Sequence, residues 1–412
     1  MKKLVFRNGI YTVLRPLYFL WKVFGLASYS YVADRRNKRV ATDYGYLNYT
    51  FTVIWLFIFT VGLPVQILAL NIFDFGSQTL FIALMLYYIS SYTSAIVAVF
   101  WVSIIKRRMF LEIIENISEV DNKIRYTPQI ENCMNRNVMF NIISEIILLT
   151  VNQCFAIIYN IPQYASVPFY IITIKTISNV PDICNILVLF QFFNLVFMTK
   201  QRYSHLNKRL TNWINVAVSS PVYLDIENDR RRQSNRAADH VIITPVCVSS
   251  FGNTEGTLKQ ADIRLLRQIY SELYDITCLI NDTYGIPILA TMCWMLTGVL
   301  CSLYEGLLNF KVLGLTDAVY AITYSLLVFK VTLFCHTATN EARSSRILVQ
   351  KLLLEGNCMN ECTEDLKMFS LQLQVMKNRY TACGFFSLNL SLFASVVSVI
   401  ASYIIIMVQI NK

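Results

Sequence analysis

Six hydrogen-bonding side chains recur at helical spacing near the C-terminus. The segment Gly384–Gln409 contains no Lys, Arg, Asp or Glu over 26 residues, and its serines and its glutamine are Ser387, Ser391, Ser395, Ser398, Ser402 and Gln409. At about 100° per residue, these six side chains fall within roughly 40° of one line on a helix. Such a stripe on an apolar helix can pack against a neighbouring helix or face water in a pore. The pattern leaves both interpretations open and favours the pore.

The sequence contains few residues that are candidates for enzymatic chemistry. The three histidines, His205, His240 and His336, form no ligand-spaced pair, and Cys358 and Cys362 lack two further ligands for zinc. No glycine-rich phosphate-binding loop is present. We therefore expect no enzyme activity, no metal, no cofactor and no nucleic acid. The acids Glu145 and Asp182 lie in apolar segments, where each is expected to have a structural partner.

The elements that must position the serine stripe are membrane spans. Of the 412 residues, 55% are hydrophobic, and the mean hydropathy is +0.47, which is typical of a membrane protein. Seven apolar runs are long enough to cross a bilayer: Leu47–Leu70, Thr79–Ile105, Val138–Ile161, Phe169–Met198, Ile286–Phe310, Leu315–Thr337 and Gly384–Ile410. The sequence therefore predicts an all-α membrane protein with seven transmembrane helices.

The positions of Lys and Arg set the orientation. Of the 36 basic residues, 32 fall on one side of the seven spans, in groups of nine, six, eleven and six. This asymmetry places the N-terminus in the cytoplasm and, after an odd number of crossings, the C-terminus outside. A G-protein-coupled receptor has the reverse orientation. None of the 11 cysteines lies in an outer loop, and the sequons at Asn48, Asn116, Asn281 and Asn389 are expected to stay unmodified.

These segments give a domain plan. Residues 1–45 are expected to form a cytoplasmic N-terminus with an interfacial helix, whose basic cluster contacts membrane lipids. Residues 46–199 would hold the first four spans, with a cytoplasmic loop near 106–137, and residues 200–285 a cytoplasmic loop with a disordered insert at 219–256. Spans five and six (286–338), cytoplasmic anchor helices (339–383) and the pore-lining span (384–412) would follow.

Two heptad-like seams lie on the cytoplasmic side of this plan. One comprises Leu266, Ile269, Leu273, Ile276 and Ile280, and the other Leu366, Phe369, Leu373, Met376 and Tyr380. They predict a helical bundle below the membrane. The bundle either joins several copies of the chain or packs within one copy.

An external ligand has to bind among the helices, because the outer loops are too short to fold alone. Aromatic residues in the outer halves of the spans would suit a small, partly polar molecule: Tyr88, Tyr92, Tyr159, Tyr170, Trp294, Tyr304, Tyr320 and Tyr324. The alternative is that these side chains form the aromatic belt at the membrane interface.

Three segments resemble the insect gustatory receptor family. Ser402-Tyr403 followed by four hydrophobic residues, Val408, Gln409 and Ile410 is similar to the family's C-terminal signature, with Ser402 in place of Thr and Ile410 in place of Phe. Phe369–Leu373 and Thr381–Phe386 also resemble the last two helices of that family.

The resemblance implies a ligand-gated, non-selective cation channel in the plasma membrane of sensory neurons. Its implied form is a tetramer of identical or related subunits, in which four copies of the last helix line one pore and a small-molecule tastant opens it. The implied positions are Gln409 for a polar ring and Ile410 for the hydrophobic constriction. The stripe itself favours Ser395, Ser398, Ser402 and Gln409 as pore-lining residues, so Ile406 and Ile410 share the prediction for the gate.

Other functions stay open at this point. An olfactory-type channel subunit is the nearest alternative, and a G-protein-coupled receptor or a transporter is less favoured because of the orientation and the lack of inverted repeats. The outer aromatic residues do not choose between bitter, sugar or other tastants.

Overall fold

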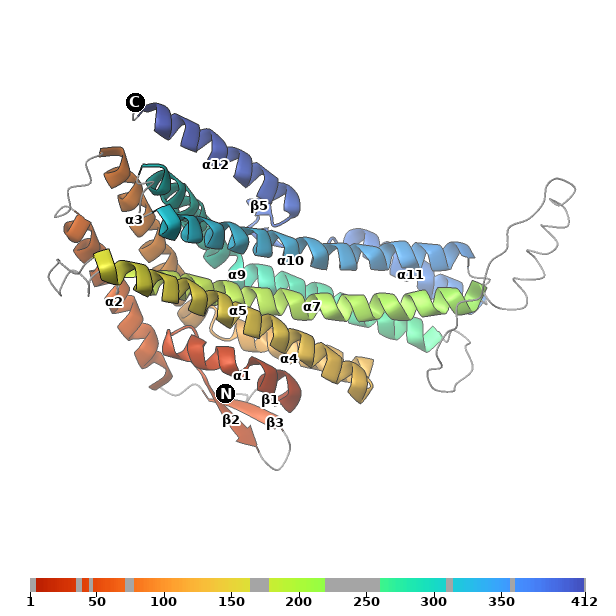
Figure 1. Ribbon diagram of the computed structural model, residues 1–412. Coiled ribbons are helices and arrows are strands. Elements are labelled where there is room, and N and C mark those ends of the chain that lie inside the picture. The colour runs from red at the N-terminus through yellow and green to blue at the C-terminus, as the bar shows by residue number, and fades with distance from the viewer. Residues whose placement is uncertain are drawn as a thin grey trace, which may run out of the picture. The chain divides into compact units, whose positions relative to one another are not determined.

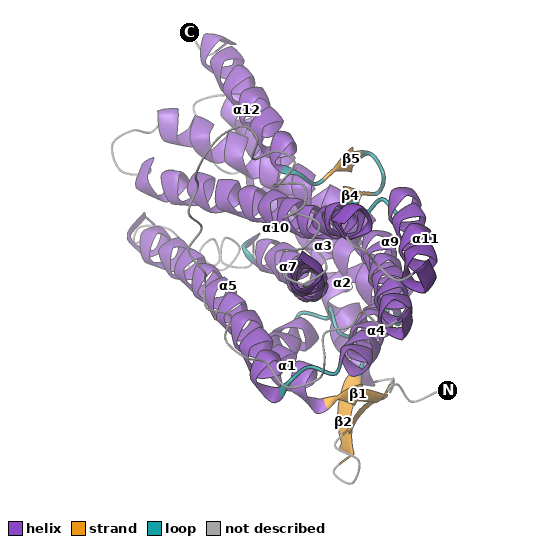
Figure 2. Cartoon of the chain, turned by 90° about the vertical axis from the view of Figure 1, so that its right-hand side faces the viewer, coloured by secondary structure: helices purple, strands orange, loops and turns teal. Residues whose placement is uncertain are grey.

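The computed structural model describes residues 5–34, 39–43, 47–70, 78–163, 178–218, 260–308, 314–355 and 360–410 (Figure 1). The predicted disordered insert at 219–256 lies outside these residues. Figure 2 shows that the described chain is almost entirely helical.

Six helices in the described part are long and apolar enough to cross a membrane. They are α2 (Leu47–Leu70), α3 (Gln78–Phe100) with its π-helical continuation η1 (Trp101–Ile105), α5 (Pro128–Gln163), α7 (Val180–Val218), α9 (Gln260–Leu308) and α10 (Gly314–Glu355). A shorter apolar helix, α12 (Leu390–Ile410), ends the chain. The remaining helices are α1 (Asn8–Val23), α4 (Met109–Ile124) and α11 (Asn360–Val375).

The three longest of the described helices extend well beyond a membrane span. α7, α9 and α10 have 39, 49 and 42 residues, whereas a bilayer needs about 20. The chain divides into two compact units, and all three helices contribute to both: the first unit comprises 1–199, 275–339 and 379–412, and the second 200–274 and 340–378.

Within the first unit, α7 is the most buried helix. Of its most apolar stretch, 83% is buried, against 22% for α2 and 33% for α5. The exposed side of α2 carries Phe57 and Leu68, and that of α5 carries Phe140 and Ile147. Apolar residues of this size on an outer helix surface are suited to lipid tails. α7 therefore forms the interior of this unit, and α2 and α5 supply outer surface.

The N-terminal helix α1 packs its apolar face on protein. Leu14, Leu17 and Trp21 are buried, and the Trp21 ring meets Phe110 of α4 edge-on at 5.5 Å. The expected interfacial helix therefore has a protein partner for its apolar side, and its position at the membrane stays a prediction. Short antiparallel strands adjoin this helix in the order β1 (Val5–Arg7), β3 (Arg39–Asp43), β2 (Ser30–Asp34) (Figure 2). The all-helical expectation missed these strands.

In the second unit, six residues of the two seams are buried within the chain. Leu266, Ile269 and Leu273 of α9 and Leu366, Phe369 and Leu373 of α11 are each at most 3% exposed. The ring of Tyr270 on α9 contacts both Tyr203 at 5.5 Å and Phe369 at 6.0 Å. These seam positions support packing within one copy, which was the alternative left open by the sequence.

The final helix begins later than its composition suggests. Residues Thr381–Ala382 (β4) and Phe386–Ser387 (β5) form a two-stranded hairpin, with Gly384 at a φ of +79° in its turn. The Asn389 side chain then accepts a hydrogen bond from the Leu392 backbone N–H at 3.0 Å, as an N-cap does. The charge-free segment from Gly384 is therefore helical only from Leu390, and Ser387 is not part of the stripe.

Candidate ligand-binding and pore-lining sites

Buried and half-buried aromatic residues from three helices gather around Tyr324 of α10. Its ring contacts Trp294 of α9 at 5.2 Å and Tyr87 of α3 at 6.4 Å, and it stacks on Tyr320 at 6.2 Å. Tyr88 lies against Tyr87 at 5.2 Å. The ring of Tyr324 fits because position 298 on α9 is a glycine: a Cβ there would lie 2.8 Å from the Tyr324 ring.

Asp182, in the first turn of α7, is the acid at the centre of this aromatic group. Its carboxylate accepts hydrogen bonds from the Tyr87 hydroxyl at 2.5 Å, the Ser91 hydroxyl at 2.5 Å and the Tyr324 hydroxyl at 3.4 Å. Only 4% of Asp182 is exposed. The helix N-terminus also favours a negative charge there. We name Asp182, Tyr87, Ser91, Tyr324, Trp294 and Tyr320 the Asp182 cluster.

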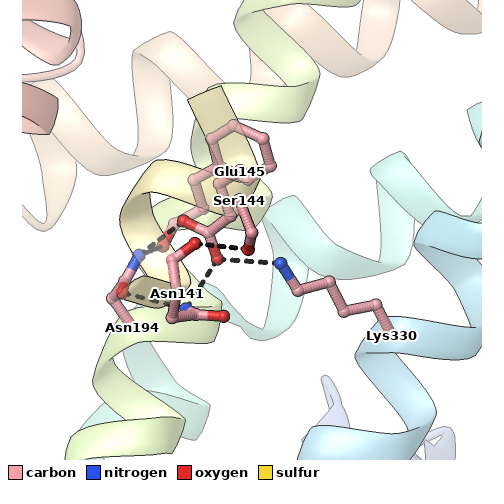
Figure 3. A network of polar contacts seen from close by, with 6 residues as sticks. Asn141, Ser144, Glu145, Asn194 and Lys330 are labelled. Carbon is pink, nitrogen blue, oxygen red and sulfur yellow. Dashed lines mark hydrogen bonds and ion pairs between the residues drawn. The ribbon is translucent and has the colours of Figure 1, made fainter. Parts of the chain in front are cut away.

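A second buried acid, Glu145 of α5, has a cation as its partner (Figure 3). Lys330 of α10 lies 3.2 Å from its carboxylate, and the side-chain amides of Asn141 and Asn194 donate to it at 2.9 and 2.8 Å. The Lys330 ammonium also lies 5.2 Å from the centre of the Phe193 ring. The structural partner expected for Glu145 is thus present, whereas the partners of Asp182 are three hydroxyl groups.

The predicted ligand-binding residues do not all meet. Tyr88, Trp294, Tyr320 and Tyr324 come together through the contacts described above. Tyr92 lies instead against α2, where its ring meets Phe59 edge-on at 6.4 Å. Tyr304 is fully buried, and its hydroxyl finds no hydrogen-bond partner among the described residues. The side chain of Tyr159 and all of Tyr170 lie outside the described part.

Sequence reasoning placed no ligand role on Asp182 or Ser91, whereas Tyr87 was among the outer-half aromatic residues considered for a ligand. Tyr87 and Ser91 are four residues apart on α3, so both point to one side of that helix. Asp182 was interpreted as an acid with a structural partner. The available signal was a charged residue in an apolar segment, which is a reason to consider function.

The described part of α12 has opposite faces with different surroundings. Val396 is buried, and the Phe393 ring meets Phe329 of α10 at 5.2 Å. Ser395, Ser398 and Ser402 lie about 140–180° around the helix from Phe393 and are exposed, as are Val397, Val399 and Tyr403. The chain therefore covers one side of its last helix and leaves the serine side open.

Two of the serine hydroxyls donate hydrogen bonds to backbone carbonyls within the helix. Ser395 donates to the Ser391 carbonyl at 3.1 Å, and Ser402 donates to the Ser398 carbonyl at 3.0 Å. Their lone pairs are left to accept from water or from another molecule. This face thus suits both the packing and the pore interpretations of the stripe.

The predicted gate residues lie at the end of α12. The Ile406 side chain is 48% exposed, and Gln409 is exposed as well. Ile410 is the last residue of the helix, and its side chain is outside the described set. A search of the described residues for three or more clustered His, Cys, Asp or Glu side chains that could hold a metal found none.

Comparison with known proteins gives matches over nearly the whole chain. A family described as 7tm Chemosensory receptor matches residues 14–412. The relative described as gustatory receptor 28a of Drosophila melanogaster is 22% identical over 433 aligned residues, covering 98% of this chain and 92% of the relative.

Two solved structures share the fold. The insect olfactory receptor OR5 from Machilis hrabei matches with a TM-score of 0.68 at 12% identity, covering 98% of this chain and 99% of that one. The same receptor in complex with eugenol matches with a TM-score of 0.64 at 11% identity, covering 98% of this chain and 100% of that one.

Proposed function

Because the chain belongs to the 7tm chemosensory receptor family, and is therefore a membrane receptor, we propose that it is a gustatory receptor that acts as a ligand-gated, non-selective cation channel. In this proposal, it works as a tetramer of identical or related subunits in the plasma membrane of sensory neurons. The observation that carries the proposal is the exposed serine face of α12, which lies opposite the face that packs on α10.

Four copies of that face would enclose a polar path through the membrane. Ser395, Ser398 and Ser402 would line it, since hydroxyl groups can replace part of the hydration shell of a cation. Gln409 would add a ring of amide groups near the end of the helix. Ile406 and Ile410 would close the path by excluding water when the four helices approach one another.

The ligand in this proposal is a small-molecule tastant bound among the outer halves of the helices. The aromatic group around Tyr324 offers apolar surface with a few hydroxyl groups, the composition typical of small-molecule sites. Ligand binding would favour an arrangement in which the ends of α12 move apart, so that cations flow down their gradient.

Cysteine accessibility in an electrically quiet cell tests the pore. We expect Ser398→Cys to make the ligand-evoked current sensitive to a charged, membrane-impermeant thiol reagent, because a pore-lining thiol is in water. Val396→Cys is the matched control, since Val396 is buried against the same chain, and the unsubstituted protein reports any effect of its own cysteines. Equal sensitivity of Ser398→Cys and Val396→Cys would contradict the assigned face.

Alanine substitutions test the gate. Ile410→Ala should raise the current in the absence of ligand, because a smaller side chain removes part of the hydrophobic barrier. Unchanged gating in each of Ile406→Ala, Gln409→Ala and Ile410→Ala would exclude this end of α12 as the gate.

An olfactory-type subunit is the second candidate, supported by the fold shared with olfactory receptor OR5. The same expression assay separates the two candidates. A gustatory receptor should respond to dissolved, non-volatile compounds, whereas an olfactory-type subunit should respond to volatile compounds or need a different partner subunit.

A further inference from the structure

We propose that the Asp182 cluster recognises a positively charged ligand, specifically an arylalkylammonium ion. This inference rests on the proposed receptor function and names the class of molecule that the receptor would detect. Three features of the Asp182 cluster support a ligand of this class: its carboxylate, its aromatic rings and the contacts that hold them in place.

The charge of Asp182 is the first feature that points to a cation. An ionised carboxylate inside a membrane protein needs compensation, because moving it from water to an apolar interior is energetically unfavourable. Glu145 obtains this compensation from Lys330 at 3.2 Å. Asp182 is 4% exposed, and no Lys, Arg or His of the described residues forms an ion pair with it. A cationic ligand would supply to Asp182 what Lys330 supplies to Glu145.

The hydrogen-bonding capacity of the carboxylate leaves room for such a ligand. A carboxylate has about four lone-pair positions, and hydroxyl groups of Tyr87, Ser91 and Tyr324 occupy three of them. The indole N–H of Trp294 also approaches the carboxylate, without forming a hydrogen bond of normal geometry, so an ammonium N–H would take the fourth position beside it. The Tyr87 and Tyr324 hydroxyl oxygens, 2.8 Å apart, can also accept from such a donor.

The surrounding rings suit both parts of an arylalkylammonium ion. A cation is attracted to the faces of Trp and Tyr rings, more strongly where water is excluded. Trp294, Tyr320 and Tyr324 are in mutual ring contact next to the carboxylate. Aromatic rings also favour offset or edge contacts with other rings. A ligand with an aryl group and an ammonium group joined by a short chain matches both features.

The Asp182 cluster is also held in place before any ligand binds. The Tyr324 ring is seated on Gly298, and the Ser90 and Thr297 side chains link α3 to α9 through a hydrogen bond of 2.6 Å. Groups fixed in this way lose little conformational freedom on binding, which favours affinity.

The test compares two compounds of similar shape, 2-phenylethylammonium and neutral 2-phenylethanol. Binding of each is measured on the purified full chain in detergent, and evoked current is measured separately in cells. We expect the wild type to bind the ammonium ion more tightly than the alcohol. Asp182→Asn should weaken ammonium binding by about tenfold or more, the effect of losing a charged hydrogen-bond partner, and should change alcohol binding by less than about twofold.

A matched control removes the other buried carboxylate. Glu145→Gln also replaces an acid by its amide, but lies outside the cluster, so the ratio of ammonium to alcohol affinity should stay unchanged. Tyr87→Phe and Ser91→Ala keep the carboxylate and each remove one hydrogen bond to it. Ser91→Ala should preserve the preference for the ammonium ion, whereas Tyr87→Phe, which also removes an acceptor for the ammonium group, should reduce it.

The outcomes separate this inference from the channel proposal. Ammonium-selective binding without any evoked current would support the Asp182 site and contradict the channel. Currents evoked by neutral compounds, with equal binding of the two probes, would overturn the Asp182 site and leave the channel in place. If Asp182→Asn fails to fold, the test rests on the wild type and on Ser91→Ala. Tighter binding of the ammonium ion in both supports the inference, and equal binding of the two probes overturns it.

Discussion

Removal of the Lys330 charge should destabilise the protein more than removal of the Glu145 charge. Glu145 is 0% exposed, whereas the side chain of Lys330 is 20% exposed. In Lys330→Met, the buried carboxylate keeps only the amide hydrogen bonds from Asn141 and Asn194. Breaking a buried ion pair by removing one partner costs about 3–5 kcal/mol, and these two bonds put the expected loss near 3 kcal/mol.

Glu145→Gln leaves the Lys330 ammonium with more favourable contacts than Lys330→Met leaves for the Glu145 carboxylate. The Lys330 ammonium keeps the Phe193, Phe334 and Phe190 rings at 5.2, 5.6 and 5.9 Å, and contacts of this kind are worth about 0.5–2 kcal/mol. Its partial exposure also lets the ammonium retain some water. We therefore expect a loss of about 1–2 kcal/mol for Glu145→Gln, allowing for one mismatched amide contact.

The double variant tests whether the two charges act on each other. With both charges removed, the methionine side chain introduced at position 330 can pack against the phenylalanine rings, so the double variant should lose less than Lys330→Met alone. Unfolding of the purified protein in mixed micelles, followed by tryptophan fluorescence as the fraction of denaturing detergent rises, gives the free energies for this cycle. Additive losses of about 4–5 kcal/mol in the double variant would refute the reasoning.

Two further substitutions probe close contacts. Gly298→Ala should cost about 1–3 kcal/mol, because the new Cβ would lie 2.8 Å from the Tyr324 ring; Gly306→Ala, whose nearest neighbour is the Asp317 Cβ at 3.5 Å, should be neutral or stabilising in the same unfolding assay. Asn281→Ala should cost about 1–3 kcal/mol, because the side chain donates to the Arg379 carbonyl at 2.7 Å and accepts from the Thr381 N–H at 3.1 Å. Asn281→Asp keeps the acceptor for Thr381 but sets a carboxylate oxygen against the Arg379 carbonyl, so it should not restore the lost stability. A glycosidase should leave the electrophoretic mobility of the wild type unchanged. A glycan on Asn281 would contradict both these contacts and the predicted orientation.

The membrane-spanning elements could be predicted from hydropathy, because the thickness of the bilayer sets the minimum length of an apolar helix that crosses it. The predicted span Leu47–Leu70 coincides with α2, and Thr79–Ile105 nearly coincides with α3 and η1. The helix ends outside the apolar runs were less visible. α9 begins at Gln260, although its apolar run begins at Ile286, because a helix can continue through polar residues without any hydropathy signal.

Local capping explains the error at the start of the last helix. Hydropathy is uniform from Gly384 onward, but Asn389 caps α12 and the preceding residues pair as a hairpin. The absence of charged residues predicts neither the N-cap nor the hairpin. The serine spacing after Leu390 was readable, since the 3.6-residue period places those side chains on one face regardless of where the helix starts.

The roles of the two buried acids could not be separated by sequence. Lys330 is 185 positions from Glu145, and the hydroxyl partners of Asp182 come from α3 and from α10. Only the packing of helices far apart in sequence shows which acid has a cation. The same limit applied to the tyrosines, of which Tyr324 joins the Asp182 cluster while Tyr92 faces α2.

Within the first unit, α10 contacts both the Asp182 cluster and the last helix, α12. α10 bears Tyr320 and Tyr324 of the Asp182 cluster, and Phe329, five residues after Tyr324, contacts Phe393 of α12. Five helical residues span only about 7.5 Å, so the two contacts lie on consecutive turns of a single rigid element. Lys330, the next residue, anchors that turn to α5 through Glu145. A ligand that shifted Tyr324 would therefore act on α12 through α10, with the ion pair as the contact that resists the shift, so weakening of the pair should ease opening even though it destabilises the fold.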